Sequence, residues 1–145
     1  MIDKFDGKYA FLSNFYPSPI PVQFDEDIII NAPTVEHLFQ YMKTQSDEEG
    51  IAILQAQTPG QAKRLGRKCH LRKDWEEIKD EVMYRSLKYK FEIPELRELL
   101  LATGNEELVE GNYWNDTYWG VCNGIGQNKL GKLLMKVREE IRDDT

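Results

Sequence analysis

The chain has 145 residues, 25 of them acidic and 19 basic, and a formal net charge of −6. This length fits one domain whose core can fold without metal or disulfide staples. The acidic balance disfavours non-specific binding along a nucleic-acid backbone, because such binding needs a basic surface. No apolar stretch reaches the length of a membrane span and no signal-peptide pattern opens the chain, so we expect a cytoplasmic protein.

The two cysteines, Cys69 and Cys122, lie far apart, and the chain has only two histidines. This spacing matches neither a zinc site nor a disulfide framework. We therefore expect two buried thiols and no bound metal or other cofactor.

Short apolar segments separated by turns fill the N-terminal third of the chain. Residues 11–16 are expected to form an ordered loop. Residues 21–24 and 28–30 then flank an acidic turn at residues 25–27, which is the pattern of a β-hairpin.

The rest of the chain is mainly helical in pattern. Thr34, Thr58 and Asp74 are candidate N-caps, and Pro59 and Pro94 suit first helical positions. With the apolar periodicity, these signals predict helices over residues 35–45, from 47 through 54, 59–67, 75–92, 94–103 and 129–142. Residues 107–110 and 118–122 are expected to be short strands. The predicted fold is a single α+β domain over residues 1–145, mostly α-helical with a small β-sheet.

The predicted helix after Thr34 carries a polar stripe beside its apolar one. A step of 100° per residue places Glu36, Gln40 and Lys43 on this polar stripe. The Cα atoms of Glu36 and Lys43 are expected about 10.5 Å apart, and the Lys43 side chain leans back toward Glu36. An acid and an amine can then share one pocket. The ordinary alternative is a solvated helix face with the spacing of structural ion pairs.

Basic side chains gather between residues 63 and 73. Lys63, Arg67 and Arg72 belong to this segment of an otherwise acidic chain. Guanidinium forks and lysine point charges suit a phosphate or pyrophosphate. The alternative is a solvated helix flank, balanced by the acidic residues within 74–77.

Aromatic residues are interleaved with Asn, Asp and Gly over residues 114–128. Trp119 and Gly120 follow Asp116 closely, so this segment can form a stacking platform with a carboxylate beside it. Trp75 can add another ring. The alternative is that each tryptophan belongs to the core.

Taken in order, these segments resemble the NADAR family (NAD- and ADP-ribose-associated), also called YbiA-like. The matching segments run almost from end to end of the chain. They are Phe11-Leu12-Ser13-Asn14-Phe15-Tyr16, Thr34-Val35-Glu36-His37 with Gln40 and Lys43, Ala62-Lys63 with Gly66-Arg67, Arg72 with Asp74-Trp75, Lys79 with Val82-Met83, Lys90-Phe91, Thr103-Gly104, Leu108-Val109-Glu110, Asp116 with Trp119-Gly120, and Gly126 with Asn128, Leu130-Gly131 and Leu134-Met135.

The resemblance implies an α+β domain that hydrolyses the N-glycosidic bond between a ribose carbon and an amine. Family substrates are ribosylamino pyrimidine phosphates of the riboflavin pathway and guanine bases that carry ADP-ribose. The expected partner is therefore a small nucleotide or an ADP-ribosylated base. Contact with nucleic acid is expected only locally, at a modified base, and none with a membrane. The last helix suits packing on its own core, which favours a monomer, but the sequence leaves the oligomeric state open.

The resemblance also assigns roles to residues. In one route, a neutral Lys43 amine attacks the anomeric carbon and forms a Schiff base, while Glu36 transfers protons. This route requires burial or a neighbouring cation to depress the pKa of Lys43. In the other route, Glu36 and Asp116 act as a pair of carboxylates, in the manner of glycosidases. The sequence leaves both routes open.

The expected substrate-binding residues surround these three candidate catalytic residues. Trp75 and Trp119 are expected to stack on the base, and Lys63, Arg67 and Arg72 to contact phosphate. Asn14 and Phe15 are expected to hold the ribose or the base edge. Gln40 and Gly120 complete the set.

A rival hypothesis is a non-catalytic module that binds ADP-ribose or an NAD-type nucleotide through the same residues without turnover. A nucleic-acid-binding protein without chemistry ranks third, because the charge balance is wrong.

Overall fold

The structure is a computed structural model that describes residues 1–24 and 26–144. Its backbone contacts divide the chain into two compact units. One unit is Asn14–Lys90, and the other combines Met1–Ser13 with Phe91–Thr145. Asp25, which belongs to the predicted acidic turn, and Thr145 lie outside the described residues.

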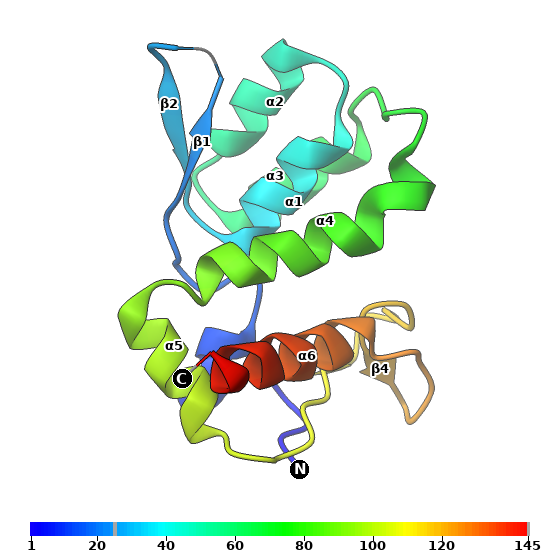
Figure 1. Cartoon of the computed structure of the whole chain (residues 1–145). Coiled ribbons are helices and arrows are strands. Elements are labelled where there is room, and N and C mark those ends of the chain that lie inside the picture. The colour runs from blue at the N-terminus through cyan, green and yellow to red at the C-terminus, as the bar shows by residue number, and fades with distance from the viewer. Residues whose placement is uncertain (25, 145) are drawn as a thin grey trace. The chain divides into compact units, whose positions relative to one another are not determined.

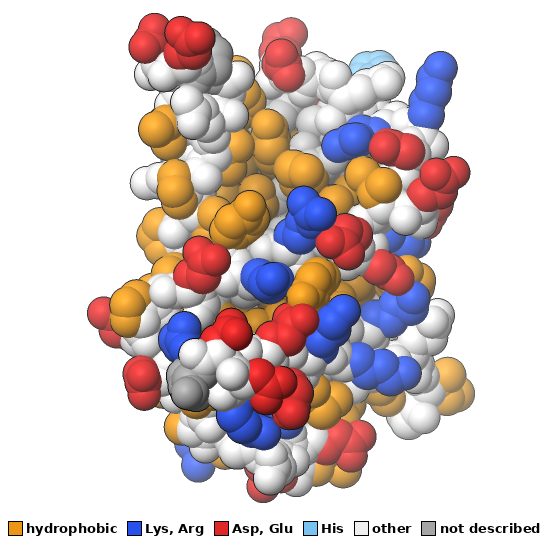
Figure 2. Space-filling view, in the orientation of Figure 1, with side chains coloured by type: hydrophobic (Ala, Val, Ile, Leu, Met, Phe, Trp, Pro, Cys, Tyr) orange, Lys and Arg blue, Asp and Glu red, His pale blue; other side chains and the backbone are white. Residues whose placement is uncertain are grey.

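The first unit begins with the predicted β-hairpin, which the structure confirms. Strands β1 (Ile20–Gln23) and β2 (Ile29–Ala32) pair antiparallel. The buried end of the hairpin joins Ile20 to Ala32, whereas Ile29 at the other end is 61% exposed. Figure 2 shows hydrophobic side chains on the surface of this hairpin. Next to the turn, the ring of Phe24 packs edge-on against Tyr41, with 5.4 Å between ring centroids.

Four helices follow the hairpin: α1 (Val35–Lys43), α2 (Asp47–Leu54), α3 (Pro59–Arg67) and α4 (Trp75–Lys90). All four start as the sequence predicts. The side chains of Thr34, Ser46 and Thr58 accept backbone N–H bonds at the starts of α1, α2 and α3. Helix α1 ends before the expected residue 45, because Thr44 is extended and forms a β-bridge with Leu71. Helix α4 ends two residues before the predicted 92.

Helix α1 is the centre of this unit. It packs against α2, α3 and α4 (Figure 1), and its residues 35–40 are all buried. Two glycines let the neighbouring helices α2 and α3 approach α1 closely. A Cβ on Gly50 of α2 would lie 2.9 Å from a ring carbon of Tyr41, and one on Gly66 of α3 would overlap the side chain of Gln40. The backbones of α2 and α3 therefore lie in close contact with side chains of α1.

The second unit contains the 3-10 helix η1 (Gly7–Leu12), α5 (Pro94–Ala102) and α6 (Lys129–Asp143), with the short parallel strands β3 (Gly111–Asn112) and β4 (Val121–Cys122). The helix α5 packs against α6 and η1. Leu100 and Leu134 are fully buried, and Arg138 of α6 donates to the Thr103 hydroxyl after α5 at 2.9 Å. The two predicted helices are confirmed.

Both predicted strands of this unit need correction. Residues 107–110 are not a strand; Leu108 makes one isolated parallel bridge to Ile2 at the start of the chain. Residues 118–122 are a strand only at Val121–Cys122. The earlier part is a turn, because the N–H groups of Tyr118 and Trp119 bond to the Asp116 carboxylate. Side-chain hydrogen bonds of this kind compete with strand pairing.

The predicted α+β class, mostly helical with little sheet, is confirmed; the described strands form two separate two-stranded sheets. Among the described residues, no helix combines the length and apolarity needed to cross a membrane.

Lys90, the last residue of α4, has no exposed surface. Its ammonium lies 5.9 Å from the centre of the Tyr16 ring. Burial lowers the pKa of Lys90 from 10.5 to about 7, because it disfavours the charged form.

This buried amine predicts a pH-dependent stability. Between pH 7 and 10.5 the unfolded chain holds one more proton at Lys90 than the folded chain does. The free energy of unfolding should therefore rise with pH in this window, by at most about 1.4 kcal/mol per unit. Urea denaturation across the window should show a shallower rise for Lys90→Met. The exposed Lys88→Met on the same helix is the control, and its slope should match that of the unaltered chain. A Lys90→Met slope equal to both would contradict the prediction.

Candidate active site

The N-terminal end of α1 is anchored by a buried histidine. The Thr34 Oγ1 accepts the His37 backbone N–H at 3.1 Å and lies 2.8 Å from His37 Nδ1. The other ring nitrogen, Nε2, lies 3.0 Å from the carbonyl oxygen of Ala56. A carbonyl only accepts, so Nε2 carries the proton and Nδ1 accepts from the Thr34 hydroxyl. Burial lowers the pKa of His37, in keeping with this neutral form. The Glu36 N–H adds a bond to the Asn14 carbonyl at 3.1 Å.

The polar stripe of α1 forms a chain of hydrogen bonds. The Lys43 Nζ donates to Gln40 Oε1 at 2.9 Å, and Gln40 Nε2 donates to Glu36 Oε1 at 2.8 Å. Glu36 and Gln40 are only 7% and 5% exposed. The alternative of a solvated helix face is therefore wrong for these residues. The structure links an acid and an amine through one buried amide.

Helix α3 lies directly against this amide. A Cβ on Gly66 would come within 1.9 Å of Gln40 Oε1 and 2.7 Å of its Cδ, so only glycine leaves room for the side chain. Ala62, one turn earlier on α3, is fully buried. Two small residues four apart let α3 approach α1 closely.

The pKa of Lys43 is lowered. The largest cause is burial, which disfavours the charged amine. The positive charges of Arg67 and Lys63 lower the pKa further, whereas Cys69 and Glu36 act in the opposite direction. The sequence prediction required burial or a cationic neighbour near Lys43, and this structure has both.

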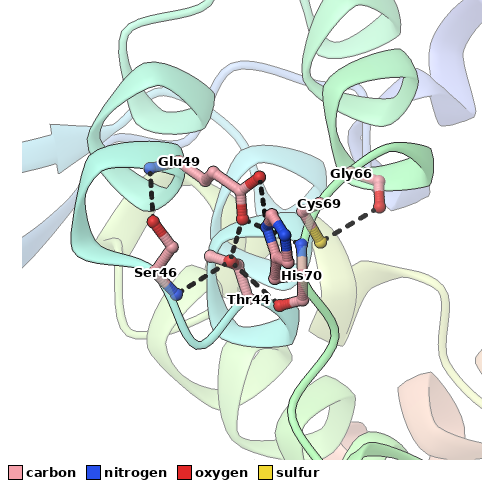
Figure 3. Close-up of polar contacts among 6 residues, drawn as sticks. All are labelled: Thr44, Ser46, Glu49, Gly66, Cys69 and His70. Carbon is pink, nitrogen blue, oxygen red and sulfur yellow. Dashed lines mark hydrogen bonds and ion pairs between the residues drawn. The ribbon is translucent and has the colours of Figure 1, made fainter.

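The C-terminal end of α1 is held by the segment after α3. The Lys43 carbonyl accepts the Arg72 N–H at 3.0 Å. One carboxylate oxygen of Glu49 accepts from the Thr44 hydroxyl at 3.0 Å and from the His70 N–H at 2.8 Å; the other lies 3.0 Å from His70 Nδ1 (Figure 3). The bond from the His70 N–H is the main cause of the lowered pKa of Glu49. These contacts hold the residue after Lys43 in place.

The three basic candidates differ in their surroundings. Lys63 is half-buried and Arg67 exposed, one turn apart on α3. Arg72 forms two hydrogen bonds, of 3.1 and 3.2 Å, with the carboxylate of Asp74. The positive charges of Lys63 and Arg67 act on the Lys43 amine and lower its pKa. The Arg72 guanidinium is instead paired with the carboxylate of a neighbouring residue.

The three remaining candidates of the first unit, Trp75, Asn14 and Phe15, differ in burial. Trp75 is 4% exposed and packs on Phe39, with ring centroids 5.0 Å apart, so its ring lies in the core. Asn14 Nδ2 lies 3.5 Å from the sulfur of Met83, and Asn14 Oδ1 is buried with no hydrogen-bond partner among the described residues. Phe15 is 45% exposed.

Asp116, Trp119 and Gly120 belong to the second unit, where they organise one loop. The Asp116 Oδ1 accepts the Trp119 N–H at 2.9 Å, and Asn112 bonds the Asp116 backbone at both N–H and carbonyl. A Cβ on Gly120 would overlap the carboxylate of Glu110. The predicted pairing of Asp116 with Glu36 stays a prediction.

Sequence reasoning missed two features that support the site. Gly66 belongs to a segment that matches the family, and the Ala62–Gly66 spacing also signals close helix packing. Glu49 gave no signal, because its contact with His70 joins residues 21 positions apart. In the described residues, no group of three or more His, Cys, Asp or Glu side chains could hold a metal ion.

The protein is a small, mainly helical α+β domain in which an acid, an amide and an amine are linked along one face of α1. The family model of the NADAR domain matches residues 2–142. N-glycosidase YbiA of Escherichia coli (strain K12) is 42% identical over 137 residues, which cover 92% of this chain and 82% of that relative. The chain belongs to the NADAR domain family, as its motifs indicated.

Two further comparisons agree. Riboflavin biosynthesis protein VVA0006 of Vibrio vulnificus (strain YJ016) is 37% identical over 142 residues, which cover 95% of this chain and 37% of that protein. The NMR structure of the E. coli protein YbiA matches with a TM-score of 0.80 and 39% sequence identity, over 99% of this chain and 88% of that chain.

The contact between Gly66 and Gln40 predicts different outcomes for two glycines of α3. A Cβ on Gly60 would meet only Thr58 Oγ1 at 3.9 Å, so Gly60→Ala should raise the free energy of unfolding by up to about 1 kcal/mol. Gly66→Ala should be about 1–3 kcal/mol less stable than Gly60→Ala, because its Cβ displaces the Gln40 amide. Urea denaturation measures both.

A double-mutant cycle isolates the cause. In a Gln40→Ala background, Gly66→Ala should lose most of its penalty, because the overlapping amide is gone. If Gly66→Ala lowers the free energy of unfolding as much in the Gln40→Ala background, overlap with the Gln40 amide is not the cause of the loss.

Proposed function

We propose that this chain hydrolyses the N-glycosidic bond of a nucleotide-type glycosylamine. The observation that carries the proposal is the chain of hydrogen bonds from Lys43 through Gln40 to Glu36 on a buried helix face. The names of its relatives, N-glycosidase YbiA and a riboflavin biosynthesis protein, support this reaction class. The substrates we propose are guanine bearing ADP-ribose, or a ribosylamino pyrimidine phosphate.

The lowered pKa of Lys43 supports the Schiff-base route. A glycosylamine opens its ribose ring to an imine, and a neutral Lys43 amine adds to the anomeric carbon. The bond from that carbon to the base nitrogen breaks, while the ionised Glu36 carboxylate carries the two amine protons of Lys43, one after the other, to the base nitrogen, so that the base leaves as a neutral amine. Water then adds to the lysine imine and its two protons pass to the lysine nitrogen, which releases the sugar aldehyde, restores the amine and leaves Glu36 ionised as before.

The two-carboxylate route with Glu36 and Asp116 is the alternative mechanism. Asp116 Oδ1 accepts the N–H groups of Tyr118 and Trp119. Those bonds tie the Asp116 carboxylate to its own loop, whereas Lys43 is linked to Glu36 by hydrogen bonds through Gln40. We therefore favour Lys43 as the nucleophile.

Lys63 and Arg67 are the proposed phosphate contacts. They lie one turn apart on α3, the helix whose Gly66 touches Gln40. A guanidinium fork and an ammonium suit a phosphate or pyrophosphate. We further propose a cytoplasmic monomer that meets nucleic acid only locally, at a modified base.

The activity is tested by offering both substrate classes to the purified chain with a chelator present. Mass spectrometry should detect free ADP-ribose or ribose 5-phosphate. Glu36→Gln and Lys43→Met should each lower the rate by at least about 100-fold while the far-UV circular dichroism stays unchanged. Tight binding without product would instead support the binding module, and full activity in both variants would refute the assignment.

The mechanism is tested by reduction with borohydride during turnover. The Schiff-base route predicts a sugar adduct on Lys43 in the unaltered chain, located by peptide mass spectrometry, and none in Lys43→Met. The exposed Lys73→Met is the control and should keep the adduct on Lys43. An active enzyme that never gives an adduct would favour the two-carboxylate route.

The phosphate assignment predicts a change in KM. Arg67→Gln should raise KM for a phosphorylated substrate by about 10-fold, because a charged hydrogen bond is lost. KM for the dephosphorylated analogue should stay constant. The matched control is Arg64→Gln, an exposed arginine on the same helix. Equal KM changes in the two variants would remove Arg67 from the phosphate site.

A further inference from the structure

The amide of Gln40 has one orientation that satisfies both of its neighbours. Lys43 only donates, so it must face the amide oxygen, whereas an ionised Glu36 only accepts and must face the amide nitrogen. The distances of 2.9 and 2.8 Å fit this arrangement. Gln40 therefore lies between the acid and the amine as a neutral, directional spacer.

We propose that Gln40 is a positioning residue for lysine-dependent cleavage: it orients the Lys43 amine and keeps the Glu36 carboxylate out of direct ion pairing with it. This inference rests on the proposed function and deepens it. Gly66 belongs to the same device, because any larger residue would occupy the position of the Gln40 amide.

Orientation is the first contribution of the spacer. A neutral amine has two N–H bonds and one lone pair. When one N–H is donated to Gln40 Oε1, the amine is held at a fixed point and its lone pair stays available for attack. The amide itself cannot swing away, because its carbonyl oxygen lies against the backbone of Gly66.

Separation of charge is the second contribution. A carboxylate in direct contact with a buried lysine would stabilise the ammonium and remove the nucleophile. The groups that act on Lys43 are Glu36 on α1, Lys63 and Arg67 on α3, and Cys69 just after α3. Glu36 is the one carboxylate among them, and the Gln40 amide bridges it to the amine.

The test compares Gln40→Glu with Gln40→Met. Glutamate keeps the shape of glutamine but puts a carboxylate beside Lys43. Methionine keeps the length but makes neither hydrogen bond. The matched control is Gln55→Glu, the same chemical change at an exposed position at the end of α2.

Two readouts separate positioning from a merely structural role. The midpoint of the Lys43 titration, followed by NMR of its side-chain carbon, should rise in Gln40→Glu by about one pH unit or more. The acidic limb of the kcat profile should move up with it, and activity should recover at high pH. Gln40→Met should lower kcat about 10-fold or more at every pH, with little change in KM. Gln55→Glu should match the unaltered chain in both readouts.

The outcomes distinguish this inference from the proposed function. If the unaltered chain cleaves neither substrate class, the proposed function fails. If it cleaves one of them, but the Lys43 midpoint and the kcat profile of Gln40→Glu stay in place, only the role of Gln40 is overturned. An unchanged kcat in Gln40→Met would overturn that role as well.

Discussion

The structure of the first unit depends on one constraint: polar groups on a buried helix face must bond to one another. Glu36 and Gln40 are almost fully buried, and an unpaired carboxylate there would cost several kcal/mol. The hydrogen bonds of Gln40 meet this requirement with a neutral group at the centre. The same bonds that make the burial tolerable also hold the acid and the amine in a defined relation. In the proposed mechanism, stability and chemistry therefore rest on the same contacts.

The rest of the unit holds α1 at both ends and along its length. The buried His37 joins its start to Ala56, shortly after α2, and the Arg72 N–H holds the Lys43 carbonyl at its end. Between them, glycine backbone from α2 and α3 touches its flanks. A nine-residue helix has little stability of its own, so its position comes from tertiary contacts. The supporting residues act on the site through the backbone of α1.

Local signals in the sequence were enough to predict the helices and the polar stripe. Thr34 and Thr58 cap helices as expected, and the periodicity after Thr34 places Glu36, Gln40 and Lys43 on one face. Two strand predictions were wrong, and one of them depends on a contact between distant residues. Residues 107–110 looked like a strand, but their partner is Ile2 at the start of the chain, through one bridge only. The core position of Trp75 depends on packing against Phe39, which lies on another helix far earlier in the chain.

The backbone contact between α3 and α1 has a consequence for how this fold diversifies. Ala62 and Gly66 are the small residues through which α3 packs closely on α1. The solvent-facing side of α3 therefore carries no packing constraint from α1. Arg64 is exposed on α3 and can change without disturbing this contact. Exposed side chains of α3 can therefore change in charge or size while the packing of α3 on α1 stays the same.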